Sequence, residues 1–137
     1  MNSNERMVKD IAKQLDDIAN GCLYICPCCG ETFDINELSQ SEEDNYYCPE
    51  CDDTILDSFT MYDYLENTLG IEYRVFNKED DINSVKICIA YGGPNIFIDT
   101  EDNKVKLYWY SDYSEYEFSQ DASNEINYVC NEIWNSQ

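Results

Sequence analysis

Histidine is absent from this 137-residue chain, and basic residues are scarce, with 8 Lys and Arg against 29 Asp and Glu. Without imidazole there is no histidine metal ligand, no histidine general base and no Ser-His or Cys-His nucleophile pair. Long apolar runs are also lacking, since none approaches the roughly 20 residues that a membrane-spanning helix needs. We therefore expect no membrane partner, and the commonest catalytic classes are disfavoured.

The shortage of basic residues gives the chain a formal charge of −21. Residues 22–60 alone carry ten acidic and no basic side chains. Proteins that grip DNA or RNA neutralise phosphates with Lys and Arg, so we expect no direct nucleic-acid binding. A field of this sign favours a strongly basic protein partner, although an ordinary protein with acidic loops would have the same composition.

Cysteine, by contrast, is plentiful, and four of the eight cysteines form two Cys-x-x-Cys pairs: Cys26 with Cys29, and Cys48 with Cys51. Each pair turns two thiols toward one point, and two pairs supply the four ligands of a zinc ribbon. Because four thiolates leave no open coordination position, we predict a structural Zn²⁺ in this site.

Two alternatives for the cysteines stay open at this stage. Cys28 or Cys22 could contribute to metal binding, although Cys26 with Cys29 has the usual ligand spacing. Disulfides in a secreted domain are the other alternative. Residues 1–21 show an amphipathic helix pattern without the apolar h-region of a secretory signal, so we expect a cytoplasmic protein with reduced thiols.

Hydrophobic periodicity predicts an α+β fold. Apolar residues recur at helical spacing over residues 4–20, with Met7 on the apolar stripe and Ser3 as N-cap. A short helix is predicted over 59–69, capped by Ser58 or Thr60, and a C-terminal helix over 120–135, capped by Ser119.

Between residues 71 and 118 the period changes to two, with a charged turn at 78–81. This pattern predicts an antiparallel β-meander whose apolar face the C-terminal helix covers. We expect residues 1–58 to form the N-terminal helix and zinc-ribbon module, with a polar turn at 36–45, and residues 59–137 to form the α+β domain. One compact unit is the alternative.

Aromatic and acidic residues mix between positions 108 and 118. Strand alternation would bury Trp109, Tyr116 and Phe118, and would expose Tyr108, Tyr110, Tyr113, Glu115 and Glu117. Exposed tyrosines beside carboxylates suit a protein interface, although an ordinary amphipathic strand pair would look the same. We take the exposed set as candidate partner-binding residues.

No catalytic constellation stands out, so a binding protein is favoured over an enzyme. A short, acidic, histidine-free chain with the ribbon cysteines Cys26, Cys29, Cys48 and Cys51 and a β-meander resembles the small proteins of phages and mobile elements. Among these it is similar in character to anti-CRISPR proteins, which inhibit the RNA-guided nuclease of type II systems.

This resemblance implies a viral inhibitor in the bacterial host cytoplasm that presents an acidic, DNA-mimicking surface to the basic channel of the nuclease. The resemblance concerns only the overall character of the chain, and no inhibitory residue can be carried over from it. A zinc-ribbon adaptor of a transcription or replication complex is the alternative, and a hydrolase with a carboxylate-bound metal is a third class.

Overall fold

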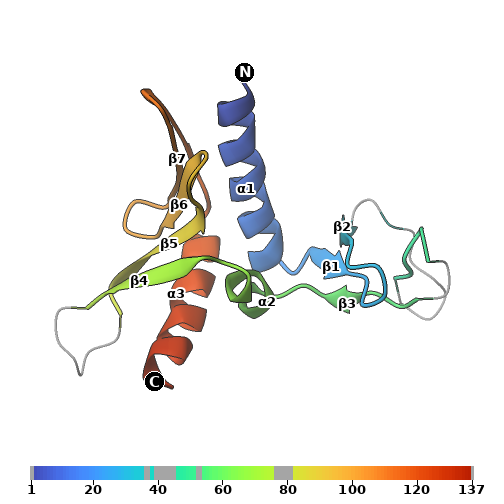
Figure 1. Ribbon diagram of the computed structural model, residues 1–137. Coiled ribbons are helices and arrows are strands. Elements are labelled where there is room, and N and C mark those ends of the chain that lie inside the picture. Colours follow the sequence, from blue (N-terminus) through green and yellow to red (C-terminus); the bar gives the residue numbers. More distant parts are fainter. Residues whose placement is uncertain (1, 36–37, 39–45, 52–53, 76–81, 137) are drawn as a thin grey trace.

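The computed structural model describes residues 2–35, 38, 46–51, 54–75 and 82–136. These residues form an α+β body and a smaller ribbon lobe that extends from its side (Figure 1), as the sequence predicted for the fold class. The turn at 78–81, and all of the turn at 36–45 except Leu38, lie outside the described residues. Each helix in the described part of the chain is too short or too polar to span a bilayer.

The body is built on a sheet of five antiparallel strands in the order β4-β5-β6-β7-β8, which confirms the predicted meander. Ile87 pairs with Ile98, and Ile98 with Val105, so these buried side chains share one face. The strands are β4 Gly70–Arg74, β5 Ser84–Ala90, β6 Asn95–Asp99, β7 Lys104–Trp109 and β8 Asp112–Glu117.

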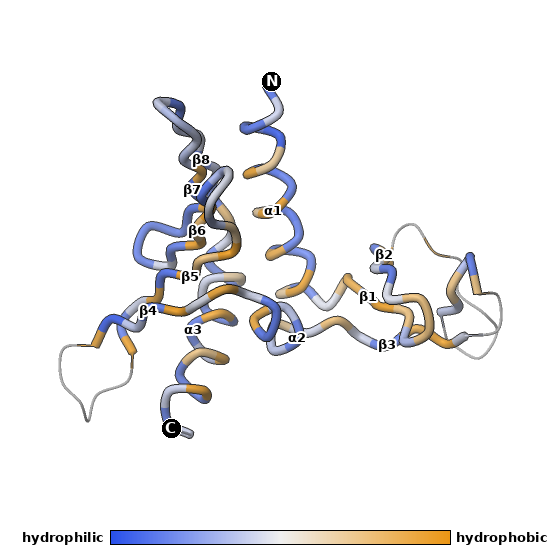
Figure 2. Tube along the Cα trace, in the orientation of Figure 1, coloured by the Kyte–Doolittle hydropathy of each residue, from blue (hydrophilic) through white to orange (hydrophobic). Residues whose placement is uncertain are grey.

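Two long helices, α1 Ser3–Ala19 and α3 Gln120–Asn135, pack on this sheet and on each other (Figures 1 and 2). Leu15 and Ile126 from the helices join the strand residues in one core. The predicted cover of the sheet by the C-terminal helix is confirmed, and α1 shares that role. The division of the chain into two domains at residue 58 stays a prediction. The buried residues of α1, which lies before that boundary, belong to the core of the body.

The start of α1 differs from the prediction. Asn2, not Ser3, is the N-cap, and its side-chain oxygen accepts a 2.8 Å hydrogen bond from the Glu5 N–H. The buried stripe runs through Val8, Ala12, Leu15 and Ile18, while Met7 is 39% exposed. Leu15 and Ile18 are thus buried as the helical spacing predicts, whereas near the start of the helix Val8 is buried in place of Met7.

The short helix α2 Met61–Glu66 links the ribbon lobe to the body. It is shorter than the predicted 59–69, and Thr60 caps it in a capping box with Asp63. The Thr60 side chain accepts from the Asp63 N–H at 3.3 Å, and the Asp63 carboxylate accepts from the Thr60 N–H at 2.9 Å. These bonds satisfy two N–H groups that the helix itself leaves unpaired.

The ribbon lobe contains a three-stranded antiparallel sheet in the order β2-β1-β3. Its strands are β1 Leu23–Ile25, β2 Thr32–Asp34 and β3 Asp57–Ser58. The Phe59 N–H donates to the Leu23 carbonyl at 2.9 Å, where the lobe joins the body. This small sheet brings the two Cys-x-x-Cys segments to the same part of the lobe.

Candidate metal centre

The first Cys-x-x-Cys segment is a tight turn between β1 and β2. The Cys26 N–H donates to the Glu31 carbonyl, and the Gly30 N–H donates to the Cys26 carbonyl, both at 2.9 Å. Gly30 has a φ of +76°, in the left-handed region that glycine adopts without a steric penalty. The turn therefore holds the buried Cys26 close to the exposed Cys29.

The second segment is also closed by backbone hydrogen bonds. The Cys48 N–H donates to the Thr54 carbonyl at 2.9 Å, and the Leu56 N–H donates to the Tyr46 carbonyl at 2.8 Å. An antiparallel bridge joins Tyr47 to Ile55. These contacts fix the position of Cys48 relative to the first turn.

The structure brings the four predicted ligands Cys26, Cys29, Cys48 and Cys51 together. Their sulfurs all lie within 4.8 Å of one another, and the Cys29 and Cys48 sulfurs are 3.7 Å apart. Tetrahedral coordination at a Zn–S distance of about 2.3 Å requires sulfurs about 3.8 Å apart. A disulfide needs about 2.05 Å. All eight cysteines are free thiols, so the geometry is that of a metal site and not of two disulfides.

The cysteines that were left open at the sequence level fall outside this cluster. Cys28 is exposed in the same turn as Cys29, and Cys22 precedes β1, with its sulfur 3.7 Å from the Asn20 carbonyl oxygen. Neither belongs to the four-sulfur group. The usual ligand spacing therefore identified the clustered thiols correctly.

The pKa values of Cys26 and Cys51 are strongly perturbed. The Cys29 N–H donates to the Cys26 sulfur at 3.4 Å, and this bond lowers the pKa of Cys26 to about 7 despite its burial. Burial and the neighbouring thiols raise the pKa of Cys51. One thiolate thus forms readily, and further thiolates repel it unless a cation shares the site.

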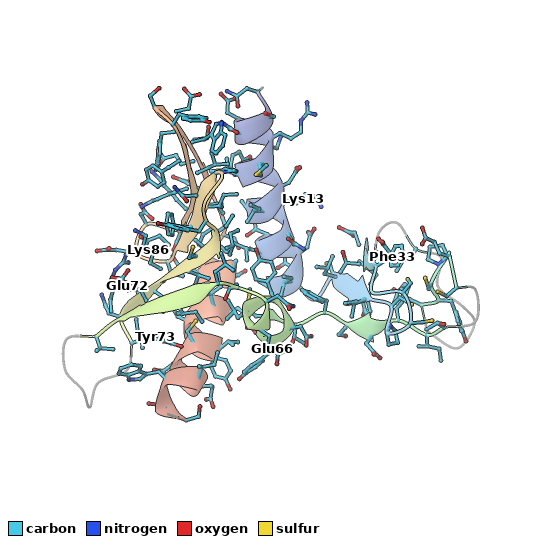
Figure 3. All side chains as sticks on the ribbon, viewed as in Figure 1. Lys13, Phe33, Glu66, Glu72, Tyr73 and Lys86 are labelled. Atoms are coloured by element: carbon cyan, nitrogen blue, oxygen red, sulfur yellow. The ribbon has the colours of Figure 1, made fainter. Side chains whose placement is uncertain are left out.

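Apolar and aromatic side chains surround the sulfurs on the inner side of the lobe. Cys26, Cys48 and Leu56 are buried, and the rings of Tyr24 and Tyr46 are 5.2 Å apart. Phe33 also packs against this cluster, and Figure 3 shows it within the lobe. The sequence offered no periodic signal for this shell, because it is assembled from short, irregular segments.

The predicted partner-binding residues lie at the far edge of the sheet from β4. Their exposure is confirmed: Tyr108 is 42%, Tyr110 88% and Tyr113 46% exposed, and Glu115 and Glu117 are exposed as well. Phe118 is buried and Trp109 half-buried. The prediction for Tyr116 is wrong, because this side chain is 42% exposed on β8, an edge strand.

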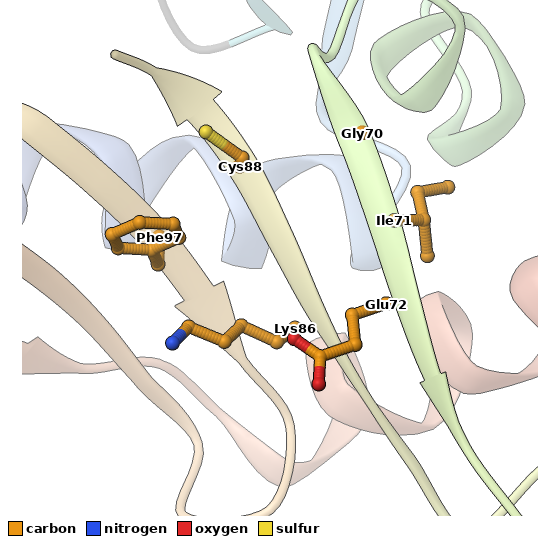
Figure 4. A pocket seen from close by; sticks show the side chains of 6 residues that line it. All are labelled: Gly70, Ile71, Glu72, Lys86, Cys88 and Phe97. Carbon is orange, nitrogen blue, oxygen red and sulfur yellow. The ribbon is translucent and has the colours of Figure 1, made fainter. Parts of the chain in front are cut away.

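The face of the sheet opposite the helices has a shallow hollow of about 250 Å³ between β4, β5 and β6 (Figure 4). It lies beside Gly70, which pairs with Cys88. The Lys86 nitrogen is 4.6 Å from the centre of the Phe97 ring, and the Cys88 sulfur is 3.6 Å from the Ala90 carbonyl oxygen. The Lys86 ammonium and the Cys88 thiol, which line the hollow, thus already contact other groups of the protein.

Comparisons of the chain with protein-family models, with curated proteins and with solved structures found no match. The cysteine cluster and the acidic, tyrosine-bearing surface are therefore the features from which we infer function.

Proposed function

We propose that Cys26, Cys29, Cys48 and Cys51 bind one structural Zn²⁺ ion. An all-thiolate tetrahedral site selects zinc or iron, and the closed donor set leaves no position for a substrate. Elemental analysis of protein purified without added metal should give one zinc per chain, and Co²⁺ exchanged into the site should give a tetrahedral thiolate spectrum. Bound iron, or protein without metal, would contradict this assignment.

We further propose that the protein inhibits a nucleic-acid-handling enzyme by occupying a basic surface meant for DNA or RNA. The observation that carries this proposal is the charge of −21, with ten acidic and no basic side chains in residues 22–60. Carboxylates on a folded scaffold imitate a row of phosphates without the ordering cost of a flexible chain. In the version we favour, the enzyme is the type II RNA-guided nuclease, and the blocked step is loading of target DNA into its positive channel.

The ion pairs of the body support a surface of net negative charge. Arg74 pairs with Asp99 at 2.8 Å, and Lys104 pairs with Glu115 at 2.9 Å. Because the chain has 8 basic and 29 acidic residues, most carboxylates have no basic residue of this chain to neutralise them. The excess is available to a basic partner.

The test is cleavage of target DNA by a guide-loaded nuclease with and without this protein. We expect inhibition when the protein is added before the DNA, and little inhibition when it is added after. Affinity should fall as salt rises, because steering is screened over a Debye length of about 8 Å at physiological ionic strength. The double variant Glu31→Lys, Glu50→Lys reverses two exposed ribbon charges. It should weaken inhibition more than the control Glu125→Lys, Glu132→Lys, which reverses two exposed charges on α3.

Undiminished cleavage at a large excess of the protein, with several orthologous nucleases, would contradict the nuclease version.

One observation favours the second candidate, an adaptor of a transcription or replication complex. The ribbon lobe extends from the side of the body, and β2 and β3 are the two edge strands of its sheet (Figure 1). Salt-resistant binding to polymerase subunits through this lobe would support the adaptor.

A further inference from the structure

Two hairpin turns carry exposed aromatic side chains at the same end of the body sheet (Figure 1). Tyr91 follows β5 and is 78% exposed, and Tyr110 lies between β7 and β8 and is 88% exposed. The turns are adjacent, since a Cβ atom at Gly93 would lie 3.8 Å from the Trp109 ring. We call Tyr91, Tyr108, Trp109, Tyr110 and Tyr113 the aromatic tip.

The rings of the β7–β8 hairpin support one another. The Trp109 and Tyr110 rings are 4.4 Å apart, and the Tyr108 and Tyr113 rings are 4.9 Å apart. Tyr113 also donates a 2.6 Å hydrogen bond to Glu115. Clustered, exposed aromatic rings with few rotatable bonds are the usual anchors of protein interfaces.

The backbone of Tyr110 is strained. Trp109 pairs with Asp112, so Tyr110 and Ser111 form a two-residue turn, and Tyr110 has a φ of +55°. Glycine and asparagine favour this left-handed region, whereas bulky residues avoid it. The other non-glycine residue with a positive φ among the described residues is Asn103, at +58°, and asparagine tolerates this region. Burial does not offset the strain at Tyr110, because the ring is 88% exposed.

The β7–β8 hairpin that carries most of the tip is acidic. Residues 107–118 include three acidic side chains, Asp112, Glu115 and Glu117, and no basic side chain. The nearest lysines along β7 are engaged, Lys104 with Glu115 at 2.9 Å and Lys106 with Asp102 at 2.7 Å. Arginine stacks its planar guanidinium on an aromatic ring and pairs with a carboxylate at the same time, whereas the compact, strongly hydrated lysine ammonium does so less well.

We propose that the aromatic tip is a docking surface for arginine side chains of a basic protein partner. This inference rests on the proposed function and names the contact chemistry by which the partner is held. Stacking of single-stranded nucleic-acid bases on the same rings is disfavoured, because the surrounding carboxylates repel phosphates.

The test compares two labelled peptides of equal charge, nona-arginine and nona-lysine, binding to the full, metal-loaded chain. The tip variant is Tyr91→Ala with Tyr110→Gly, and the matched control is Tyr128→Ala, which removes a ring that is 60% exposed on α3. Because glycine suits the backbone at position 110, the Tyr110→Gly change alone should leave the melting temperature unchanged or raise it. The tip variant is therefore expected to fold.

We expect the wild-type chain and Tyr128→Ala to bind nona-arginine about fivefold more tightly than nona-lysine. The tip variant should bind the two peptides within about twofold of each other, because it lacks Tyr91 and Tyr110, the two most exposed rings of the tip, while charge attraction remains. Salt-sensitive binding of both peptides, with the same ratio in all three proteins, would overturn the docking surface and leave the proposed function standing. Binding of neither peptide would count against both. Tip-dependent binding of an oligothymidine in place of nona-arginine would assign the rings to nucleic-acid bases and overturn the arginine proposal.

Discussion

The body and the ribbon lobe belong to one chain but depend on different sources of stability. Among the described residues, eighteen buried side chains from α1, α2, β1, the body sheet, Phe118 and α3 form the core of the body. The buried cluster of the ribbon, among the described residues, is Cys26, Cys48 and Leu56. Each large apolar side chain stabilises a fold by about 1.5–3 kcal/mol on burial, so the body can be held by its core alone, whereas the proposed metal would supply much of the stability of the ribbon.

The two regions meet at a small junction. Leu23 in β1 belongs to the core of the body, and the Phe59 N–H donates to its carbonyl. Lys13 on α1, on the side toward the lobe in Figure 3, reaches Asp34 on β2 at 3.4 Å. The root of the ribbon is thus fixed to the body, while we expect its cysteine cluster to depend on the proposed ion. The following predictions test how independent the two regions are.

The largest effect is expected for Cys48→Ser. Structural zinc contributes about 10–16 kcal/mol of apparent binding free energy, so loss of a buried ligand should abolish stoichiometric metal binding and unfold the ribbon. Hydrogen exchange should show lost protection in β1, β2 and β3 with protection retained in β5, β6 and β7. The control is Cys28→Ser, which alters an exposed thiol of the same region and should keep the metal. Loss of protection throughout the body sheet would show that the two regions fold as one.

The reverse experiment removes a side chain from the core of the body. Ile98 is fully buried, and Ile98→Ala should lower the free energy of unfolding of the body by about 2–5 kcal/mol in urea titrations. The spectrum of cobalt bound to the cysteine cluster should be unchanged below the unfolding transition. Leu69→Ala, at a side chain that is 64% exposed, should change stability by about 0.5 kcal/mol or less. Altered cobalt coordination in Ile98→Ala would contradict independent regions.

An intermediate effect is expected for the ion pair of Asp99 with Arg74 on the outer face of the sheet. Burial raises the pKa of Asp99. Two hydrogen bonds from Arg74, of 2.8 and 3.0 Å, and one from the Glu101 N–H, of 3.0 Å, lower this pKa by more than burial raises it. The pKa of Asp99 is therefore below its usual value. A lowered folded-state pKa stabilises the fold above the unfolded-state pKa of about 3.9, and this contribution is lost as pH falls through the folded-state pKa.

The variant that tests this pair is Asp99→Asn. It should lower stability by about 1–3 kcal/mol at pH 7, and the difference from wild type should shrink in urea titrations below about pH 4. Asp102→Asn, at a carboxylate that is 40% exposed beside Lys106, is the control and should have a smaller effect. A difference for Asp99→Asn that does not change with pH would show that its charge is not the cause.

The smallest effect is expected for Lys13→Gln at the junction. The Lys13 side chain is 66% exposed and pairs with Asp17 at 2.8 Å and with Asp34 at 3.4 Å. Exposed ion pairs contribute about 0–1 kcal/mol, so the unfolding of the body and exchange in β2 should barely change. A loss of stability well above about 1 kcal/mol, or lost protection in β2, would show that this pair couples the lobe to the body.

The sequence predicted the α+β class, the meander and the clustering of four thiols because each has a local signature. A strand alternates every two residues, a helix recurs every 3.6, and a Cys-x-x-Cys turn directs its sulfurs whatever surrounds it. The burial of Val8 in place of Met7 on α1 has no such signature. The same holds for Tyr116, whose exposure follows from its place on the edge strand β8.

By itself, the sequence determined the periodic elements, the four clustered thiols and the acidic charge, because these depend on residues close together in the chain or on composition alone. The tertiary structure decided which residues far apart in the chain meet. It brought Asp99 to Arg74, and the turn after Tyr91 to Trp109. Such contacts depend on strand register and on the way α1 and α3 pack together, and packing of a whole core is not encoded in any single segment.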